Sequence, residues 1–384
     1  MANPYVVKAQ EGFDIYPSGP VVNNYPFQVI GSGNTPNIVS GAGVFGGNAL
    51  EFNTGTTNGP SIAYSFPSTG QFMRNSTANT GVYLYSMNFW FQCTVAPTST
   101  TPMPVVQWST QASLSSTIPA MGIMLSNGSP TLCFPSTVAS IATAPYTVPI
   151  SVGTAYWINI MMVGSPNAQL VASYKLSSVP IQTGVFLTYG SDPISTNVCN
   201  AAVFYGGGAA LGQYLIDDMM IQASSGADAD WPFGQGGTTT PTAPVIAAAP
   251  IIAPRRIFAL PANANGSVTQ WTTMDNGSTP NWQAASEGGT AYVQATASGQ
   301  TDLYMVNTAS ANITSPIAVS FRANSNKYLS VAPTVQDSGG AVTQNPGIVS
   351  KGPSEFVCVM EQTVGGAAWT AANIATEGFG QTSM

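Results

Sequence analysis

The residues best placed to do chemistry in this sequence are two adjacent carboxylates, Asp217 and Asp218. They interrupt the apolar run at residues 214–221 (YLIDDMMI), which has the pattern of the closing strand of a domain. Alternation along a strand predicts that neighbouring side chains point to opposite faces of the sheet. We therefore expect at least one of the two carboxylates to be buried, where it needs a partner.

Glycoside hydrolysis is the enzymatic alternative, because it needs only two carboxylates about 5–10 Å apart in a cleft. Opposite faces would make Asp217 and Asp218 a poor acid/base pair, and the only glutamates before residue 224 are Glu11 and Glu51. The chain has no histidine, which excludes Ser-His-Asp and Cys-His hydrolysis and histidine-ligated metal sites. It also lacks a Gly-rich phosphate loop with lysine. We expect no enzymatic activity.

Aromatic side chains are the second candidate set, since an exposed ring can stack on a sugar. Those that lie among the apolar runs are Trp90, Trp108, Trp157, Tyr83, Tyr85 and Tyr189. In a domain of this size most of them belong to the core. Tyr83 and Tyr85, at the junction of a loop and a strand, are the first candidates for a ligand site.

The amino-acid composition limits the classes of partner that this chain is expected to bind. Charged residues make up 6% of the 384 residues, against roughly 25% in ordinary soluble domains. Such a surface loses little hydration when it packs on copies of itself or on other proteins, which indicates a member of an assembly. A net charge of −7 with eight basic residues argues against nucleic acid. No apolar run is long enough to cross a bilayer, and the N-terminus lacks a basic region followed by an apolar core, so we expect neither membrane insertion nor secretion.

Short apolar runs separated by Gly, Pro and Asn predict that the chain is all-β. Residues 87–95 (MNFWFQCTV) are the clearest strand, with apolar side chains on one face and Asn88, Gln92 and Thr94 on the other. Asn127-Gly128 predicts a hairpin. Further strands are expected at residues 13–16, 27–30, 61–66, 105–108, 122–126, 131–134, 156–163, 170–176, 185–189 and 202–205. Strands at this density predict two packed antiparallel sheets over residues 1–223.

The rest of the chain divides into two parts. Residues 224–256 are rich in Pro, Gly and Thr and predict an extended connector. Residues 257–384 return to strand patterns, at 288–293, 302–306, 317–321 and 356–360, which predict a second, smaller β-sandwich. A short helix is expected to start near Thr370.

The first domain resembles the concanavalin-type, laminin-G-like jelly roll. The resemblance is carried, in order, by residues 46–52 (GGNALEF), 87–91 (MNFWF), 156–160 (YWINI) and 214–221 (YLIDDMMI). Family members often have a histidine after the tryptophan of the third motif, where this chain has Asn159. The resemblance implies a structural Ca²⁺, for which Asp217, Asp218, Asp228 and Asp230 are candidates. We favour the alternative, in which a buried Asp accepts backbone N–H bonds, and expect no other cofactor.

The C-terminal part resembles the last domain of tailed-bacteriophage virion proteins. It shares residues 290–293 (TAYV), 302–304 (DLY), 367–370 (AAWT) and 379–380 (FG), but has 363–366 (TVGG) where Pro-x-Thr-Gly is usual. This resemblance implies a non-enzymatic fibre, spike, decoration or minor capsid protein of a virion assembled in the host cytoplasm. Its partners would be other virion proteins and copies of itself in a homo-oligomer, with a trimer as one candidate. The alternative is a carbohydrate-binding adhesin for a host-surface glycan, and a glycan hydrolase is less favoured.

Overall fold

The computed structural model describes most of the chain. The described residues are 5–14, 16–21, 27–31, 33–52, 55, 59–65, 83–109, 117–134, 146–164, 170–176, 187–188, 201–224, 256–258, 260–274, 279–286, 292–308, 313–314, 316, 319–325, 331–337, 339–340, 342–344, 354–360, 363 and 366–383. They fall into two compact units, Met1–Ile257 and Phe258–Met384. The predicted connector 224–256 remains a prediction, because residues 225–255 lie outside the described part.

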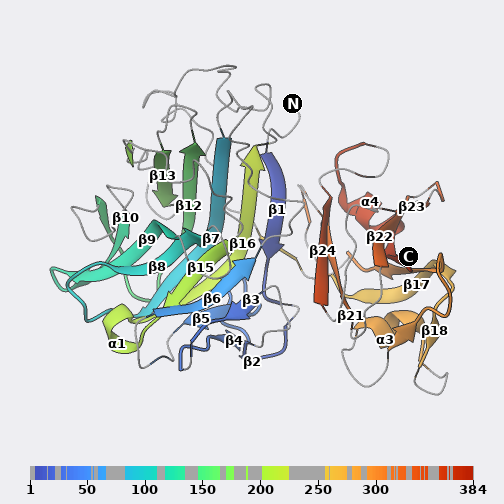
Figure 1. The fold of residues 1–384 in the computed structure, drawn as a ribbon, viewed down its shortest axis with the longest axis horizontal. Helices are drawn as coiled ribbons and strands as arrows, with labels where there is room; N and C mark the ends of the chain where they lie inside the picture. The colour runs from blue at the N-terminus through green and yellow to red at the C-terminus, as the bar shows by residue number, and fades with distance from the viewer. Residues whose placement is uncertain are drawn as a thin grey trace. The chain divides into compact units, whose positions relative to one another are not determined.

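Unit 1 is built from two antiparallel sheets (Figure 1). The nine-stranded sheet has the order β14 (Leu187–Thr188), β13 (Leu170–Leu176), β12 (Ala155–Gly164), β7 (Tyr83–Val95), β16 (Gln213–Ser224), β5 (Ala49–Phe52), β4 (Asn37–Val39) and β2 (Gly19–Pro20), and β1 (Tyr5–Glu11) also pairs with β16. The seven-stranded sheet has the order β11 (Tyr146–Pro149), β10 (Ser129–Phe134), β9 (Thr117–Ser126), β8 (Met103–Ser109), β15 (Ala201–Gly206), β6 (Gly59–Ser65) and β3 (Phe27–Val29). A short helix, α1 (Gly208–Leu211), joins β15 to β16.

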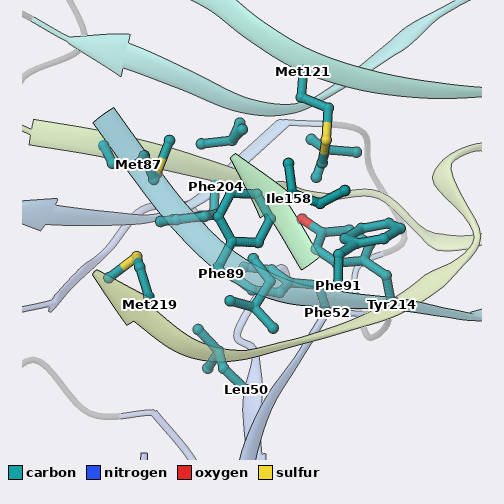
Figure 2. Close-up of a cluster of buried hydrophobic side chains, with 14 of the residues drawn as sticks. Leu50, Phe52, Met87, Phe89, Phe91, Met121, Ile158, Phe204, Tyr214 and Met219 are labelled. Carbon is teal, nitrogen blue, oxygen red and sulfur yellow. The ribbon is translucent and has the colours of Figure 1, made fainter. Parts of the chain in front are cut away.

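The two sheets of unit 1 enclose one apolar core, which is how alternating strands become a sandwich. From β7, Met87, Phe89 and Phe91 are fully buried in it. Figure 2 shows these three side chains among others from both sheets, with Met121 and Phe204 from the seven-stranded sheet and Leu50 and Met219 from the nine-stranded sheet. Unit 1 is therefore a concanavalin-like jelly-roll sandwich, as the sequence predicts.

The backbone conformation at two turns explains why one sequence-based prediction is confirmed and another is wrong. Asn127 and Gly128 have φ angles of 50° and 77° and close the β9–β10 hairpin, as predicted. The strand predicted at residues 13–16 is not formed by the described residues 13, 14 and 16, because Phe13 has a φ of 58° and the chain turns there. The buried Glu11 closes this turn: its carboxylate accepts bonds from the Phe13 N–H (3.2 Å) and the Tyr16 hydroxyl (2.8 Å).

Unit 2 is also β. Its five-stranded sheet has the order β17 (Ala262–Thr269), β20 (Thr301–Val306), β25 (Gly378–Ser383), β22 (Val331–Gln336) and β23 (Val342–Gln344), and two further pairs are β18 (Thr272–Thr273) with β19 (Val293–Gln294) and β21 (Val319–Ser325) with β24 (Ser354–Met360). Two short helices, α3 (Asn281–Ser286) and α4 (Ala371–Thr376), accompany them. The Thr370 hydroxyl caps α4 by accepting the Asn373 N–H at 3.1 Å, so the predicted tail helix is confirmed.

Candidate functional site

The strand β16 does not alternate regularly at its two carboxylates. Asp217 lies opposite Trp90 of β7, whereas Met220 lies opposite Asn88, so two residues of β16 face one residue of the partner. Asp218 is the extra residue of this β-bulge, with a φ of 48°, a conformation that Asp tolerates better than most residues. Met219, which follows, points into the core. The expectation that Asp217 and Asp218 point to opposite faces is therefore wrong, because the bulge breaks the two-residue period.

Both carboxylates are buried and fasten backbone segments that are distant in sequence. Asp217, 5% exposed, accepts the Val44 N–H on Oδ2 (2.9 Å) and the Asp218 N–H on Oδ1 (2.8 Å). Asp218, 3% exposed, accepts the Ile257 N–H on Oδ1 (2.8 Å). Its Oδ2 is buried and has no hydrogen-bond partner among the described residues. Backbone N–H groups are thus the main partners of the pair, which is the arrangement we favour from the sequence.

The electrostatics of the pair follow from burial. Burial raises the pKa of Asp217 to about 6, against the lowering effect of the Val44 and Asp218 N–H groups. Burial and then the charge of Asp217 raise the pKa of Asp218 to about 8, against the Ile257 N–H. Asp14 raises and Arg256 lowers the pKa of both carboxyls, so both charged groups lie near the pair. At pH 7 Asp218 is therefore largely protonated, which lowers the cost of its unpartnered oxygen.

A calcium ion does not fit this arrangement on the described residues. Calcium takes six to eight oxygen ligands, typically with several carboxylates. Within the described ranges, no group of three or more His, Cys, Asp or Glu side chains is spaced to hold a metal. Three of the four oxygens of Asp217 and Asp218 already accept N–H bonds. Asp228 and Asp230 lie outside the described residues, so a site that includes them remains a prediction.

The segment that Asp217 holds is a closed loop before β5. The Gly43 N–H donates to the Gly47 carbonyl (2.9 Å) and the Gly46 N–H donates to the Gly43 carbonyl (2.9 Å). At the far end, the Asn48 N–H donates to Oδ1 of Asp14 at 2.6 Å. The loop 43–48 is therefore bonded internally and at both ends.

This loop presents an aromatic ring to solvent. Phe45 is 45% exposed and contacts the half-buried Trp90 edge to face, with ring centroids 5.8 Å apart. The Arg256 guanidinium lies over the Phe45 ring, 4.9 Å from its centroid, within cation–π range. Asp14 and Arg256 are both exposed. We call Phe45, Trp90, Arg256 and Asp14 the Phe45 patch.

The aromatic residues predicted from the sequence as candidates differ in their exposure to solvent. Trp108 and Trp157 are 0% and 1% exposed, so neither can stack on a ligand. Trp90 belongs to the Phe45 patch and also contacts Trp157, with ring centroids 5.5 Å apart. Tyr83 and Tyr85 lie at the start of β7, but their side chains, like all of Tyr189, are outside the described part.

Sequence reasoning missed Phe45 and Arg256. The signal for Phe45 was its glycine flanks, Gly43 and Gly46-Gly47, which favour a loop and expose the residue between them. Arg256 had no local signal, because it reaches Phe45 only through the tertiary structure.

No protein-family model matches this chain, and no curated protein matches it. Similar solved structures include a carbohydrate esterase from the Shiga toxin-encoding bacteriophage phi24B, at 13% identity and a TM-score of 0.34, covering 52% of this chain and 90% of the esterase. Peanut lectin is 13% identical with a TM-score of 0.36 and covers 56% of this chain and 97% of the lectin. Lectin II from Ulex europaeus is 13% identical with a TM-score of 0.34 and covers 57% of this chain and all of the lectin.

Similarity at this level carries no information about a ligand of this chain.

Among the described helices, none has the length and apolarity to cross a bilayer.

Proposed function

We propose that this chain is a non-enzymatic binding protein whose jelly-roll unit recognises a carbohydrate at the Phe45 patch. The observation that carries the proposal is the 45% exposure of Phe45 on a loop closed by hydrogen bonds. An aromatic ring that is exposed and already fixed can stack on the apolar face of a sugar with little ordering cost. Arg256 and Asp14 beside it supply a donor and an acceptor for hydroxyl groups.

The charges of the patch favour a neutral sugar. One cation, Arg256, lies near three acidic side chains, those of Asp14, Asp217 and Asp218. An anionic sugar would be attracted by Arg256 but repelled by Asp14 and by Asp217 when it is ionised. We expect neutral hexoses to bind more tightly than sialylated or uronic glycans.

Binding without turnover is part of the proposal. The separated pKa values of Asp217 and Asp218 are typical of an acid/base pair. Both side chains are nearly fully buried, however, and one oxygen of each accepts a backbone N–H of a distant segment. A catalytic carboxyl must reach its substrate, and these two do not reach the surface.

A glycan array probed with the full chain tests the proposed function. We expect neutral glycans to bind, and Phe45→Ala to weaken binding by about tenfold or more, because a ligand stacked on an aromatic ring typically gains on the order of 1–3 kcal/mol. Val152→Ala is the matched control, since Val152 is 48% exposed but is not part of the patch. Equal binding by the wild type and the Phe45 variant would reject this site, and release of reducing sugar from a bound glycan would reject the absence of turnover.

We also propose, from the sequence, that the chain serves as an accessory structural protein of a bacteriophage particle, assembled in the host cytoplasm. The supporting observation is the 6% charged content, which suits repeated contacts with copies of itself and with other virion proteins. Light scattering coupled to size exclusion should then give a closed homo-oligomer, with a trimer as the first candidate. A monomer at tens of micromolar would count against this role and leave glycan binding unaffected.

A further inference from the structure

We infer that Asp217 and Asp218 are positioning residues for the Phe45 patch: adjacent on one β-bulge, they fasten the two distant segments that carry Phe45 and Arg256. The expected effect on glycan binding rests on the proposed function, whereas the hydrogen bonds that position the two segments involve no ligand.

The first fastening holds the Phe45 loop. Oδ2 of Asp217 accepts the N–H of Val44, the residue directly before Phe45, at 2.9 Å. The loop approaches so closely that a methyl group at position 43 would lie 2.7 Å from the same oxygen. Gly43 is therefore needed for this contact, and Asp217 sets the height of the loop over the sheet.

The second fastening holds the segment at Arg256. Oδ1 of Asp218 accepts the N–H of Ile257, the residue directly after Arg256, at 2.8 Å. Ile257 also packs against the backbone of Gly12, where an added methyl group would lie 3.1 Å from the Ile257 side chain. With Ile257 held on both sides, the Arg256 guanidinium is placed over the ring of Phe45.

The bulge is what allows two neighbouring residues to do this. On a regular strand, Asp217 and Asp218 would diverge to opposite faces and could not hold segments on the same side. Asp218 has two energetically unfavourable features: a φ of 48° in a non-glycine residue, and a buried oxygen with no partner among the described residues. Features of this kind persist where a local arrangement is required.

The test compares truncated and conservative variants of the full chain. Asn keeps one side-chain oxygen. At position 218 it can accept the Ile257 N–H, and at position 217 it can accept the Val44 N–H while the NH2 group replaces the oxygen that accepts the Asp218 N–H; Ala removes both oxygens. We expect Asp217→Ala and Asp218→Ala to weaken binding of the best neutral glycan by about tenfold, and Asp217→Asn and Asp218→Asn to stay within about threefold of wild type. Glu51→Ala is the matched control, because the Glu51 carboxylate accepts a bond from Gln213 (2.7 Å) and holds no segment of the patch. It should bind like wild type.

A ligand-free measurement separates this inference from the proposed function. The near-ultraviolet circular dichroism difference between wild type and Phe45→Ala reports the Phe45–Trp90 contact. At temperatures well below their melting points, we expect the Asp217→Ala and Asp218→Ala spectra to differ from wild type in the same way as the Phe45→Ala spectrum. The spectra of the two Asn variants should match wild type. Unchanged spectra in the folded Ala variants, or Asn variants as altered as the Ala ones, would overturn the positioning role. A wild type that binds no glycan would reject the proposed function, and the spectra would still decide this inference.

Discussion

At the scale of single residues, Asp218 is the most informative side chain of the molecule. It combines a left-handed backbone, near-complete burial and one oxygen with no partner among the described residues. Its pKa is raised to about 8, first by burial and then by the charge of Asp217. The folded chain therefore binds a proton at Asp218 over a pH range in which the unfolded chain, with an ordinary Asp pKa, has lost it. Stability is linked to pH through this difference.

The direction in which stability changes with pH gives the first prediction. Because the folded pKa is the higher one, the contribution of Asp218 to stability is fully present below about pH 4 and is lost as pH rises towards 8. The decline is at most about 1.4 kcal/mol per pH unit for one group. Asp218→Asn cannot ionise, so we expect it to be more stable than wild type at pH 8.5 and to flatten the pH profile. Urea unfolding at pH 5 and pH 8.5 measures this, and parallel profiles for the two proteins would refute it.

At the scale of elements, the loop 43–48 and the strand β16 depend on each other. The loop closes on itself through Gly43, Gly46 and Gly47, and it is held down by Asp217. A strand pattern read from sequence describes each of these segments separately. Their contact depends on a bulge, which adds one residue to a strand without leaving a clear mark in the apolar pattern.

The close approach of loop and strand predicts the effect of one methyl group. Gly43→Ala would place a Cβ 2.7 Å from Oδ2 of Asp217 and 3.0 Å from the carbonyl of Asn48, so the loop must move. We expect a loss of about 1–3 kcal/mol in the free energy of unfolding, as is usual for overpacking, together with weaker glycan binding.

Gly59→Ala is the control for that prediction, since the nearest described neighbour of an added methyl group would be Nδ2 of Asn34 at an ordinary 3.6 Å. Chemical denaturation of the three proteins gives the comparison. A Gly43 variant as stable as the Gly59 variant would show that the loop is not held as closely as described.

At the scale of the whole molecule, the chain has separate cores. Among the described residues, those of the large core of unit 1 lie between Phe13 and Ile221. Unit 2 has its own clusters, one around Trp369 and Phe379 and one around Trp271 and Val331. Each unit therefore contains the apolar burial that its own folding requires.

This separation predicts that residues 1–257 fold as an isolated fragment. The fragment keeps Ile257, and with it the bond to Asp218 that holds Arg256. We expect a cooperative thermal transition and a glycan affinity within about threefold of the full chain. A fragment ending at residue 255 lacks both residues and should bind more weakly. Equal affinity of the two fragments, or an unfolded 1–257 fragment, would contradict the prediction.

Much of the fold was predictable because strand periodicity is local. The alternation at residues 87–95 predicts β7, Asn127-Gly128 predicts the hairpin, and Thr370 predicts the start of α4. The site was less predictable. Strand alternation places Asp217 and Asp218 on opposite faces, and no local pattern brings Phe45 and Arg256 together. The candidates Tyr83 and Tyr85 stay a prediction, because their side chains lie outside the described part.

By itself, the sequence determined that this chain is an all-β protein with few charges and no histidine, because composition and two-residue alternation are properties of the chain alone. Only the tertiary structure decided that Asp217 and Asp218 act on the same side, and that Phe45, Trp90 and Arg256 meet. These contacts join residues far apart in the chain, and hydrogen bonds of that range depend on how the strands pair.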